Sequence, residues 1–487
     1  MGRDSLWNEL CELLERGHEP AEEELERLAN SEGLRERLRE RVDAFWVELS
    51  ESPPRAAAEA RLGHLLALRL GLADLRADLA LRDATASFVL GRPVRAAEVL
   101  EGELVHHPRG GPGTTRLRLL ALQGKVLLAR GQVQPALVAF EEALALVRAQ
   151  GLAGAEGSVL SALGNARLLQ GDLASAADYY RQAQGLAERY ATDEGEAVAL
   201  GNRALVAQLR GEHEAARGDY ELALDKTRAG GDRRCAIPLH ANLGLLCAER
   251  GELEAAREQL EQGLELTQAL EDRASEALLR VRLAHVDRMR GARAAAHEEL
   301  RRADLGLDAL ADPRDPLPGG PARLAWWIES ARLALAEGEP APALELLDLA
   351  AARAEALSHA FGACWSLVLR GEALRQRDEA AAAQALLERA RAEAASLEQP
   401  LLGGTLETYL AAAALDAGDL EGCRSALDRA RQRLDEETPA ACEAALVQVR
   451  LLRARGEASA AEELRDLLHQ RASAQGWGAL VEASAPQ

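Results

Sequence analysis

The stretch Cys235–Glu271, CAIPLHANLGLLCAERGELEAAREQLEQGLELTQALE, reads as two helices separated by a tight turn at Gly251. A glycine ends a helix at low cost because it adopts the left-handed backbone conformation without a Cβ clash. Glu252 follows, and a negative charge is favourable at the start of the second helix. The stretch therefore predicts an antiparallel pair of helices.

This turn recurs along most of the chain. Internal repeats at a fixed period indicate a stacked architecture, so the spacing of the turns decides the fold. Six turns follow one another at intervals of 40 residues: Gly91, Gly131, Gly171, Gly211, Gly251 and Gly291. Steps of 47, 40, 40 and 38 residues lead to the others: Gly338, Asp378, Gly418 and Gly456.

Small and large residues keep the same register around each turn. Small residues stand seven positions before it: Ala84, Gly124, Gly164, Ala204, Gly244, Ala284, Ala331, Gly371 and Ala411. Small residues also stand five positions after it: Ala96, Ala136, Ala176, Ala216, Ala256, Ala296, Ala343, Ala383 and Cys423. Large apolar residues stand nine positions after it: Leu100, Phe140, Tyr180, Tyr220, Leu260, Leu300, Leu347, Leu387 and Leu427. Small residues let two helices approach closely, and a helix pair cannot bury its apolar face alone, so the pairs must stack.

The motifs LGNARLLQGDLASAADYYRQA, from Leu163 to Ala183, and NLGLLCAERGELEAAREQLEQG, from Asn242 to Gly263, resemble the tetratricopeptide repeat family. The unit is longer than the usual ~34 residues, and it is similar to the 40-residue repeats of kinesin light chains, LGN-type polarity adaptors and bacterial regulators of the MalT type. The resemblance covers roughly Leu72 to His469. It implies an all-α protein: a right-handed α-α superhelical solenoid of about ten antiparallel helix pairs. HEAT-type repeats, the alternative at this length, lack the GD/GE turn.

We expect five segments along the chain. Residues 1–71 form a degenerate helical cap, in which Trp7, Phe45 and Trp46 are either buried or a docking surface. Two stacks of repeats cover 72–307 and 323–472, the second ending in a cap. Between them, the proline-rich segment 308–322 is a long loop, with a hinge or an extended binding segment as alternatives. Residues 473–487 form a loose tail, with the alternative that Trp477 in this tail folds back.

Composition and charge restrict the function. The formal charge of −21 argues against nucleic acid as a partner, because such a protein presents a basic face. Arginine supplies almost all the positive charge, which we interpret as a bacterial coding bias. Six cysteines without CxxC spacing predict reduced thiols and a cytoplasmic protein. No apolar run approaches the ~20 residues of a membrane span, so no membrane partner is expected. The sequence leaves the oligomeric state open.

We find no motif that carries catalytic chemistry. There is no GxxxxGK[ST], GxSxG or HExxH pattern, and the histidines are scattered. The pair His106 and His107 has no further ligands beside it, so we predict no metal site. The expectation is a protein that is not an enzyme and needs no cofactor.

The resemblance also implies where a ligand would bind, because the first helix of each pair lines the concave face in this fold. The positions on that face hold eight candidate residues for a peptide-binding groove: Lys125, Asn165, Asn202, Asn242, Arg282, His285, Arg288 and Arg332. Asparagine is a poor helix former, so its recurrence on one face needs a reason. Its amide can bond to an extended peptide backbone, and the arginines suit a carboxylate. The alternative is that the asparagines only bond between neighbouring helices.

Asn165 and Asn202 match the two asparagines of the carboxylate clamp known in the family. The basic residues of that clamp have no counterpart, because Ser161, Pro238 and Asn242 stand at their positions. Peptide binding through the backbone therefore fits better than a clamp. We predict a scaffold or adaptor that binds a protein or peptide segment in its groove as a regulatory subunit. The alternative is a sensor of a small ligand or peptide that acts through a partner effector.

Overall fold

The fold was analysed in a computed structural model, which describes residues 3–31, 33–107, 114–190, 193–230, 233–310 and 320–485. These residues form 25 helices and no strand. None of the described helices is both long and apolar enough to span a membrane.

The helices follow one another with short connections. The first four are α1 (Arg3–Glu15), α2 (Glu22–Ala29), α3 (Leu34–Glu51) and α4 (Pro53–Arg69). The next ten are α5 (Ala73–Val89), α6 (Pro93–Leu104), α7 (Thr114–Ala129), α8 (Val133–Gln150), α9 (Ala153–Leu169), α10 (Leu173–Tyr190), α11 (Asp193–Leu209), α12 (His213–Gly230), α13 (Arg233–Glu249) and α14 (Leu253–Ala269). The last eleven are α15 (Arg273–Met289), α16 (Arg293–Asp308), α17 (Gly320–Ala336), α18 (Pro340–Ala356), α19 (Ala360–Gln376), α20 (Ala380–Ala394), α21 (Pro400–Asp416), α22 (Leu420–Arg431), α23 (Pro439–Ala454), α24 (Ala458–Ala474) and α25 (Gly478–Ser484).

Ten helix pairs, from α5–α6 to α23–α24, each contain one of the predicted turns. At Gly251 the backbone is left-handed, with φ of 79°. The N–H of Glu252 donates to the carbonyl of Cys247 at 2.8 Å, which closes the end of α13 in a Schellman-type arrangement. The acidic residue after the turn caps the next helix in some pairs, as where Asp172 accepts from the N–H of Ser175 at 3.0 Å. The predicted all-α solenoid of stacked pairs is confirmed.

The small residues seven positions before each turn contact the large apolar residues nine positions after it, inside the same helix pair. A Cβ atom on Gly244 would lie 2.7 Å from Cγ of Leu260, so this position admits no side chain without a shift. Gly124 and Gly164 lie in the same way against the rings of Phe140 and Tyr180. The small column after the turn is fully buried from Ala96 to Cys423. Burial of this kind stabilises by ~25 cal/mol per Å² of apolar surface.

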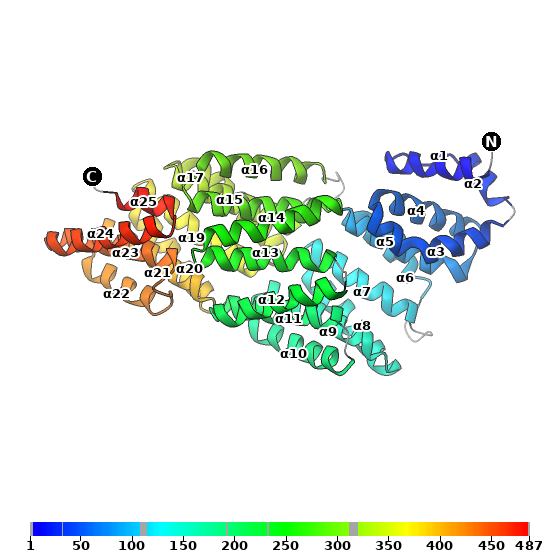
Figure 1. Ribbon diagram of the computed structural model, residues 1–487, viewed down its shortest axis with the longest axis horizontal. Coiled ribbons are helices and arrows are strands. Elements are labelled where there is room, and N and C mark those ends of the chain that lie inside the picture. The colour runs from blue at the N-terminus through cyan, green and yellow to red at the C-terminus, as the bar shows by residue number, and fades with distance from the viewer. Residues whose placement is uncertain are drawn as a thin grey trace.

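The first helices of successive pairs lie on the concave side of the stack. The odd-numbered helices from α5 to α23 pack against one another in succession, whereas successive even-numbered helices make few or no contacts. In a curved stack the elements on the inside are closest together, so the odd-numbered helices form the inner wall. Figure 1 shows the stack winding from α5 at one end to α24 at the other.

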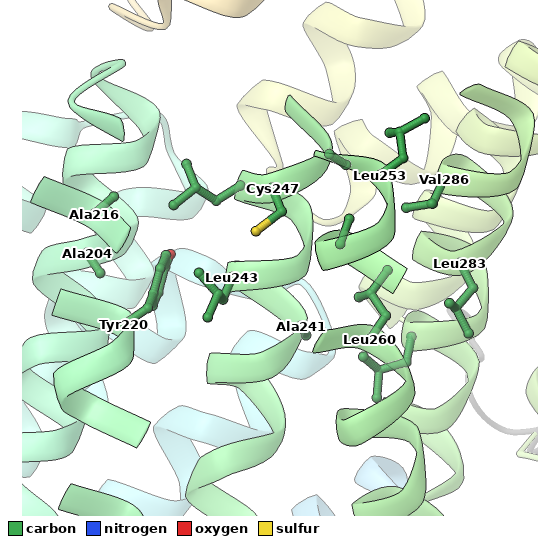
Figure 2. Packing of buried hydrophobic residues seen from close by; sticks show 14 of the residues in the cluster. Ala204, Ala216, Tyr220, Ala241, Leu243, Cys247, Leu253, Leu260, Leu283 and Val286 are labelled. Carbon is green, nitrogen blue, oxygen red and sulfur yellow. The ribbon is translucent and has the colours of Figure 1, made fainter. Parts of the chain in front are cut away.

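The apolar core runs continuously between neighbouring pairs. The largest cluster joins residues of α11 to α15 and includes Tyr220, Leu243 and Leu260, none more than 4% exposed (Figure 2). The same cluster takes in residues of α23 to α25, among them Trp477. Helices far apart in the sequence therefore share one core.

The N-terminal helices continue the stack. Helix α4 packs on α5, and both Trp7 of α1 and Phe45 of α3 are buried in apolar clusters that include residues of α4 and α5. Trp46 is 52% exposed and meets Phe45 edge to face at 5.0 Å between ring centroids. Most of the proline-rich segment, residues 311–319, lies outside the described residues.

The end of the chain differs from the loose tail that the sequence suggested for residues 473–487. Helix α24 extends to Ala474, and residues 478–484 form α25. Trp477, between them, is only 2% exposed. The physical reason is that the indole packs against the turn at Gly251 in an earlier repeat. This contact is between residues far apart in the sequence, so no local pattern predicts it.

Candidate functional site

The eight predicted groove residues lie on six successive odd-numbered helices. Lys125 is on α7, Asn165 on α9, Asn202 on α11 and Asn242 on α13. The four basic residues are on two helices: Arg282, His285 and Arg288 on α15, and Arg332 on α17. Because these helices form the inner wall of the stack, one face presents polar side chains along six repeats.

The three asparagines differ in their hydrogen bonds. Asn165 accepts a bond from the hydroxyl of Tyr180 in its own pair, at 2.6 Å. Asn242 accepts from Nη1 of Arg282 in the next pair, at 3.0 Å. Asn202 bonds to no other side chain in the described part of the chain. The side-chain oxygens of Asn165 and Asn242 therefore already accept a hydrogen bond from another helix, as the alternative of bonds between neighbouring helices expected. The amide group of Asn202 makes no such bond to the described residues.

Three of the four basic residues, His285, Arg288 and Arg332, meet at a carboxylate that the sequence analysis did not single out. Glu329 of α17, only 4% exposed, accepts from Nε of Arg288 at 2.7 Å and from Nη1 of Arg332 at 3.4 Å. Nδ1 of His285 lies 3.1 Å from the same carboxylate. We call this group of four residues, together with Arg282, the arginine wall.

Glu329 is held ionised by its neighbours. Burial by itself raises the pKa of a carboxyl, but the charges of Arg288, His285 and Arg332 lower the pKa of Glu329 well below its ordinary value. Burial lowers the pKa of His285, against the opposing charge of Glu329. The arginine wall therefore carries the positive charges of Arg282, Arg288 and Arg332 against one carboxylate.

Two further carboxyls face the arginine wall. Glu249 at the end of α13 accepts from Nε2 of Gln208 at 2.9 Å. Burial raises the pKa of Glu249 to about 7, although Gln208 and Arg282 oppose the shift. Burial also raises the pKa of Glu443 on α23, against the charges of Arg288 and Arg332. The charged groups of α13, α15, α17 and α23 thus act on one another inside the superhelix, and we call this region the polar interior.

An aromatic ring completes this side of the interior. The guanidinium carbon of Arg332 lies 4.5 Å from the ring centroid of Trp365 on α19, in cation–π geometry. Trp365 thus contributes an aromatic face beside the basic residues of the arginine wall.

Glu329 was detectable in the sequence. It stands nine positions before Gly338, as Asn202, Asn242 and Arg282 stand nine positions before their own turns. Reading that position through every repeat, rather than searching for asparagine and basic residues, finds it. Glu249 carries no such signal, because its raised pKa depends on burial among the neighbouring repeats that carry Gln208 and Arg282.

Two open clefts lie away from these residues. One, of about 720 Å³, is lined by residues at the ends of α17, α19, α21 and α23, including Arg375 and Asp416. The other, of about 860 Å³, lies between α1, α4, α5 and the ends of α14 to α16. Within the described residues no three His, Cys, Asp or Glu side chains are placed to hold a metal ion.

Comparison with known proteins supports the fold. Residues 195–269, which span α11 to α14, match the family model described as tetratricopeptide repeat. No curated protein sequence matches the chain.

Among solved structures, the chain is similar to the Rap conjugation gene regulator of the plasmid pLS20 in complex with a Phr peptide. The TM-score is 0.50 at 14% identity, over 66% of this chain and 96% of that one. NprR in complex with its cognate peptide NprX has a TM-score of 0.48 at 15% identity, over 72% and 97% of the two chains. The apo form of NprR from B. thuringiensis has a TM-score of 0.43 at 15% identity, over 82% and 100%. Identities this low concern the fold alone. The family match over residues 195–269, the stacked helix pairs and the likeness to the pLS20 regulator together show a repeat fold of the tetratricopeptide type.

Proposed function

We propose that the chain is a non-catalytic regulatory protein or adaptor that binds a peptide, or an extended segment of a partner protein, along its inner wall. The observation that carries this proposal is the row of polar side chains on six successive inner helices, from Lys125 on α7 to Arg332 on α17. A row of this kind matches a long, narrow ligand better than a compact one. The pLS20 regulator, which shares the fold, was solved with a peptide, and this supports the same class of ligand.

The chemistry of the row suggests how such a ligand is held. Asn202 has a free amide N–H₂ group and a free oxygen, which is the pair of groups that an extended backbone can satisfy. Two repeats further on, the positive charges of the arginine wall exceed its negative charge. An acidic side chain or a carboxyl terminus on the ligand is favoured there, although the protein as a whole has a charge of −21.

The proposal is tested with peptides selected from a random library on the wild-type protein. Their affinities are then measured for the double variant Asn202→Ala with Asn242→Ala, and for Arg332→Ala. We expect at least a tenfold loss for each, because each variant removes groups that would contact the ligand.

The matched control is Arg203→Ala, which lies beside Asn202 on α11 but is 47% exposed and pairs with Asp219 of α12. This variant should bind the peptides normally. Equal affinity for the wild type and the double variant would exclude the inner wall as the binding site.

A further inference from the structure

Successive turns of the superhelix contact each other along a line of glycines. A Cβ atom on Gly131 would lie 2.7 Å from the carbonyl oxygen of Ala356, and one on Gly91 would lie 2.8 Å from Cδ2 of Leu310. Gly171 lies in the same way against Leu397. The turn of an early repeat therefore packs on the residues that follow the second helix of a much later repeat. We call this line of contacts the seam.

Trp477 is the largest side chain in the seam. It lies against Gly251, and its indole Nε1–H donates to the carbonyl oxygen of Gly251 at 2.7 Å across 226 residues of sequence. The same separation relates Leu357 to Gly131 and Leu397 to Gly171. Trp477 thus occupies a regular position of the seam, with an aromatic ring and a directed hydrogen bond in place of an aliphatic side chain.

Helix α25 extends this contact to the next turn. Gly478 lies so close to the carbonyl of Arg290 that a Cβ atom there would clash with it. Glu482 accepts from Nη2 of Arg293 at 2.7 Å, and both side chains are about half exposed. Helix α25 packs on α15, as Figure 1 also shows. Trp477 and the first residues of α25 therefore contact the turns at Gly251 and at Gly291.

These contacts join the two sides of the polar interior. The arginine wall is on α15 and α17, whereas Glu443 is on α23, which α25 contacts. Moving α25 away from the turns would let α23 to α25 separate from α13 to α15. At the other glycines of the seam, Gly91, Gly131, Gly171 and Gly211, the side chains in contact are smaller than tryptophan, mainly leucine and proline.

We propose that α25, with Trp477, is a clasp that keeps the superhelix closed, and that release of Trp477 from Gly251 opens the molecule. The opening itself does not depend on the identity of any ligand. Its consequence, that the clasp controls how fast a peptide enters and leaves the interior, rests on the proposed function.

The protein contains its own reporter for opening. Cys247 is only 2% exposed and belongs to the apolar cluster that includes Trp477. Burial raises the pKa of its thiol to about 11, so it reacts slowly while the clasp is closed. Cys11 is fully buried among α1 to α5, in a separate cluster, and serves as the matched control.

The test is the rate at which N-ethylmaleimide modifies each cysteine in the full chain without ligand, followed by mass spectrometry. For Trp477→Ala we expect Cys247 to react at least tenfold faster and Cys11 to react at its wild-type rate. Trp477→Phe keeps most of the apolar contact but loses the hydrogen bond, so its Cys247 labelling rate should lie between those of the wild type and Trp477→Ala. The radius of gyration measured by small-angle X-ray scattering should rise in the same order.

An unchanged rate at Cys247 would overturn the proposal. So would an equal rise at Cys11, since Trp477 would then stabilise the whole fold rather than the closed state. If Trp477→Ala does not fold, Glu482→Arg is used instead. We expect it to raise the labelling rate of Cys247 two- to threefold. The double variant Glu482→Arg with Arg293→Glu should restore the wild-type rate. The absence of both effects would also exclude the clasp.

The clasp and the peptide site are tested separately, because labelling uses no peptide. If peptide affinity falls in the variant that lacks Asn202, but Trp477→Ala leaves the labelling rate of Cys247 unchanged, the proposed function stands and the clasp is excluded. If peptide affinity is unchanged but the labelling rate of Cys247 rises, the clasp stands and the inner wall is excluded as the peptide site.

Discussion

The inner wall differs between α9–α13 and α15–α17, although the same positions of the repeat line both parts. In the first part the wall is neutral and its asparagines bond within a pair, to a neighbouring helix or, at Asn202, to no described side chain. In the second part the inner wall is charged, and the carboxylate of Glu329 accepts hydrogen bonds from Arg288 and Arg332, whose two positive charges exceed its own. Equivalent positions of the repeat therefore carry different chemistry in the two parts of the inner wall. Its asparagines bond differently from repeat to repeat, and its charged members on α15 and α17 join neighbouring repeats through Glu329.

The largest effect that would sharpen this comparison is expected at Glu329. Glu329→Gln leaves two arginines without their buried counter-charge, so we expect the free energy of unfolding to fall by ~3 kcal/mol. The pKa of Glu329 is lowered in the folded protein, so its contribution is present above the ordinary pKa and is lost as the pH falls below it. Chemical unfolding at pH 7 and at pH 4 measures both effects.

The control for that variant is Glu337→Gln, which removes an exposed ion pair with His297. Such pairs contribute ~0.5 kcal/mol or less. If the two variants have the same stability, the arginine wall is not a stabilising network and its charges are available to a ligand.

A smaller effect, of opposite sign in pH, is expected at Glu249. Its pKa is raised to about 7, so between pH 4.5 and 7 the folded protein keeps a proton that the unfolded chain has lost. Stability should therefore decrease as the pH rises through this window. Glu249→Gln should abolish the decrease and be more stable than the wild type at pH 8, by ~2 kcal/mol.

Unfolding measured at pH 5, 6.5 and 8 tests this prediction. Glu254→Gln, at an exposed carboxylate on the neighbouring helix, is the control and should follow the wild type. A wild-type protein whose stability is flat between pH 5 and 8 would show that Glu249 is ionised at ordinary pH and that the interior is well hydrated.

The smallest effects distinguish the asparagines. Asn165→Ala removes the acceptor of the buried Tyr180 hydroxyl and should destabilise by ~1 kcal/mol. Asn202→Ala removes no side-chain bond to any of the residues that the structure describes, and it replaces a poor helix former, so it should be neutral or stabilise by ~0.5 kcal/mol. Thermal unfolding of both variants is the measurement. A clear loss of stability for Asn202→Ala would mean that this residue is structural and not free for a ligand.

Much of the fold could be predicted because its determinants are local. Gly251 and its equivalents end helices through their own backbone conformation, and Gly244 meets Leu260 within a single pair. Both relations repeat at a fixed spacing, so counting finds them. The positions that line the inner wall follow from the same register, and that register also includes Glu329.

The chemistry of the wall could be predicted less well. Burial and pairing decide whether an arginine faces a ligand or a carboxylate, and neither is a property of one repeat. Asn202 and Asn242 occupy equivalent positions, yet only Asn242 faces an arginine of the next pair. The difference arises because Arg282 is peculiar to α15.

By itself, the sequence determined that this protein is a stack of helix pairs, where each pair turns, and which residues fill each pair. These follow from interactions over a few tens of residues, which recur unchanged. Only the tertiary structure decided that the seam closes, that Trp477 binds Gly251, and that Glu249 and Glu443 face the arginine wall. These contacts depend on the small rotation between neighbouring repeats, which accumulates over many units before distant parts of the chain meet.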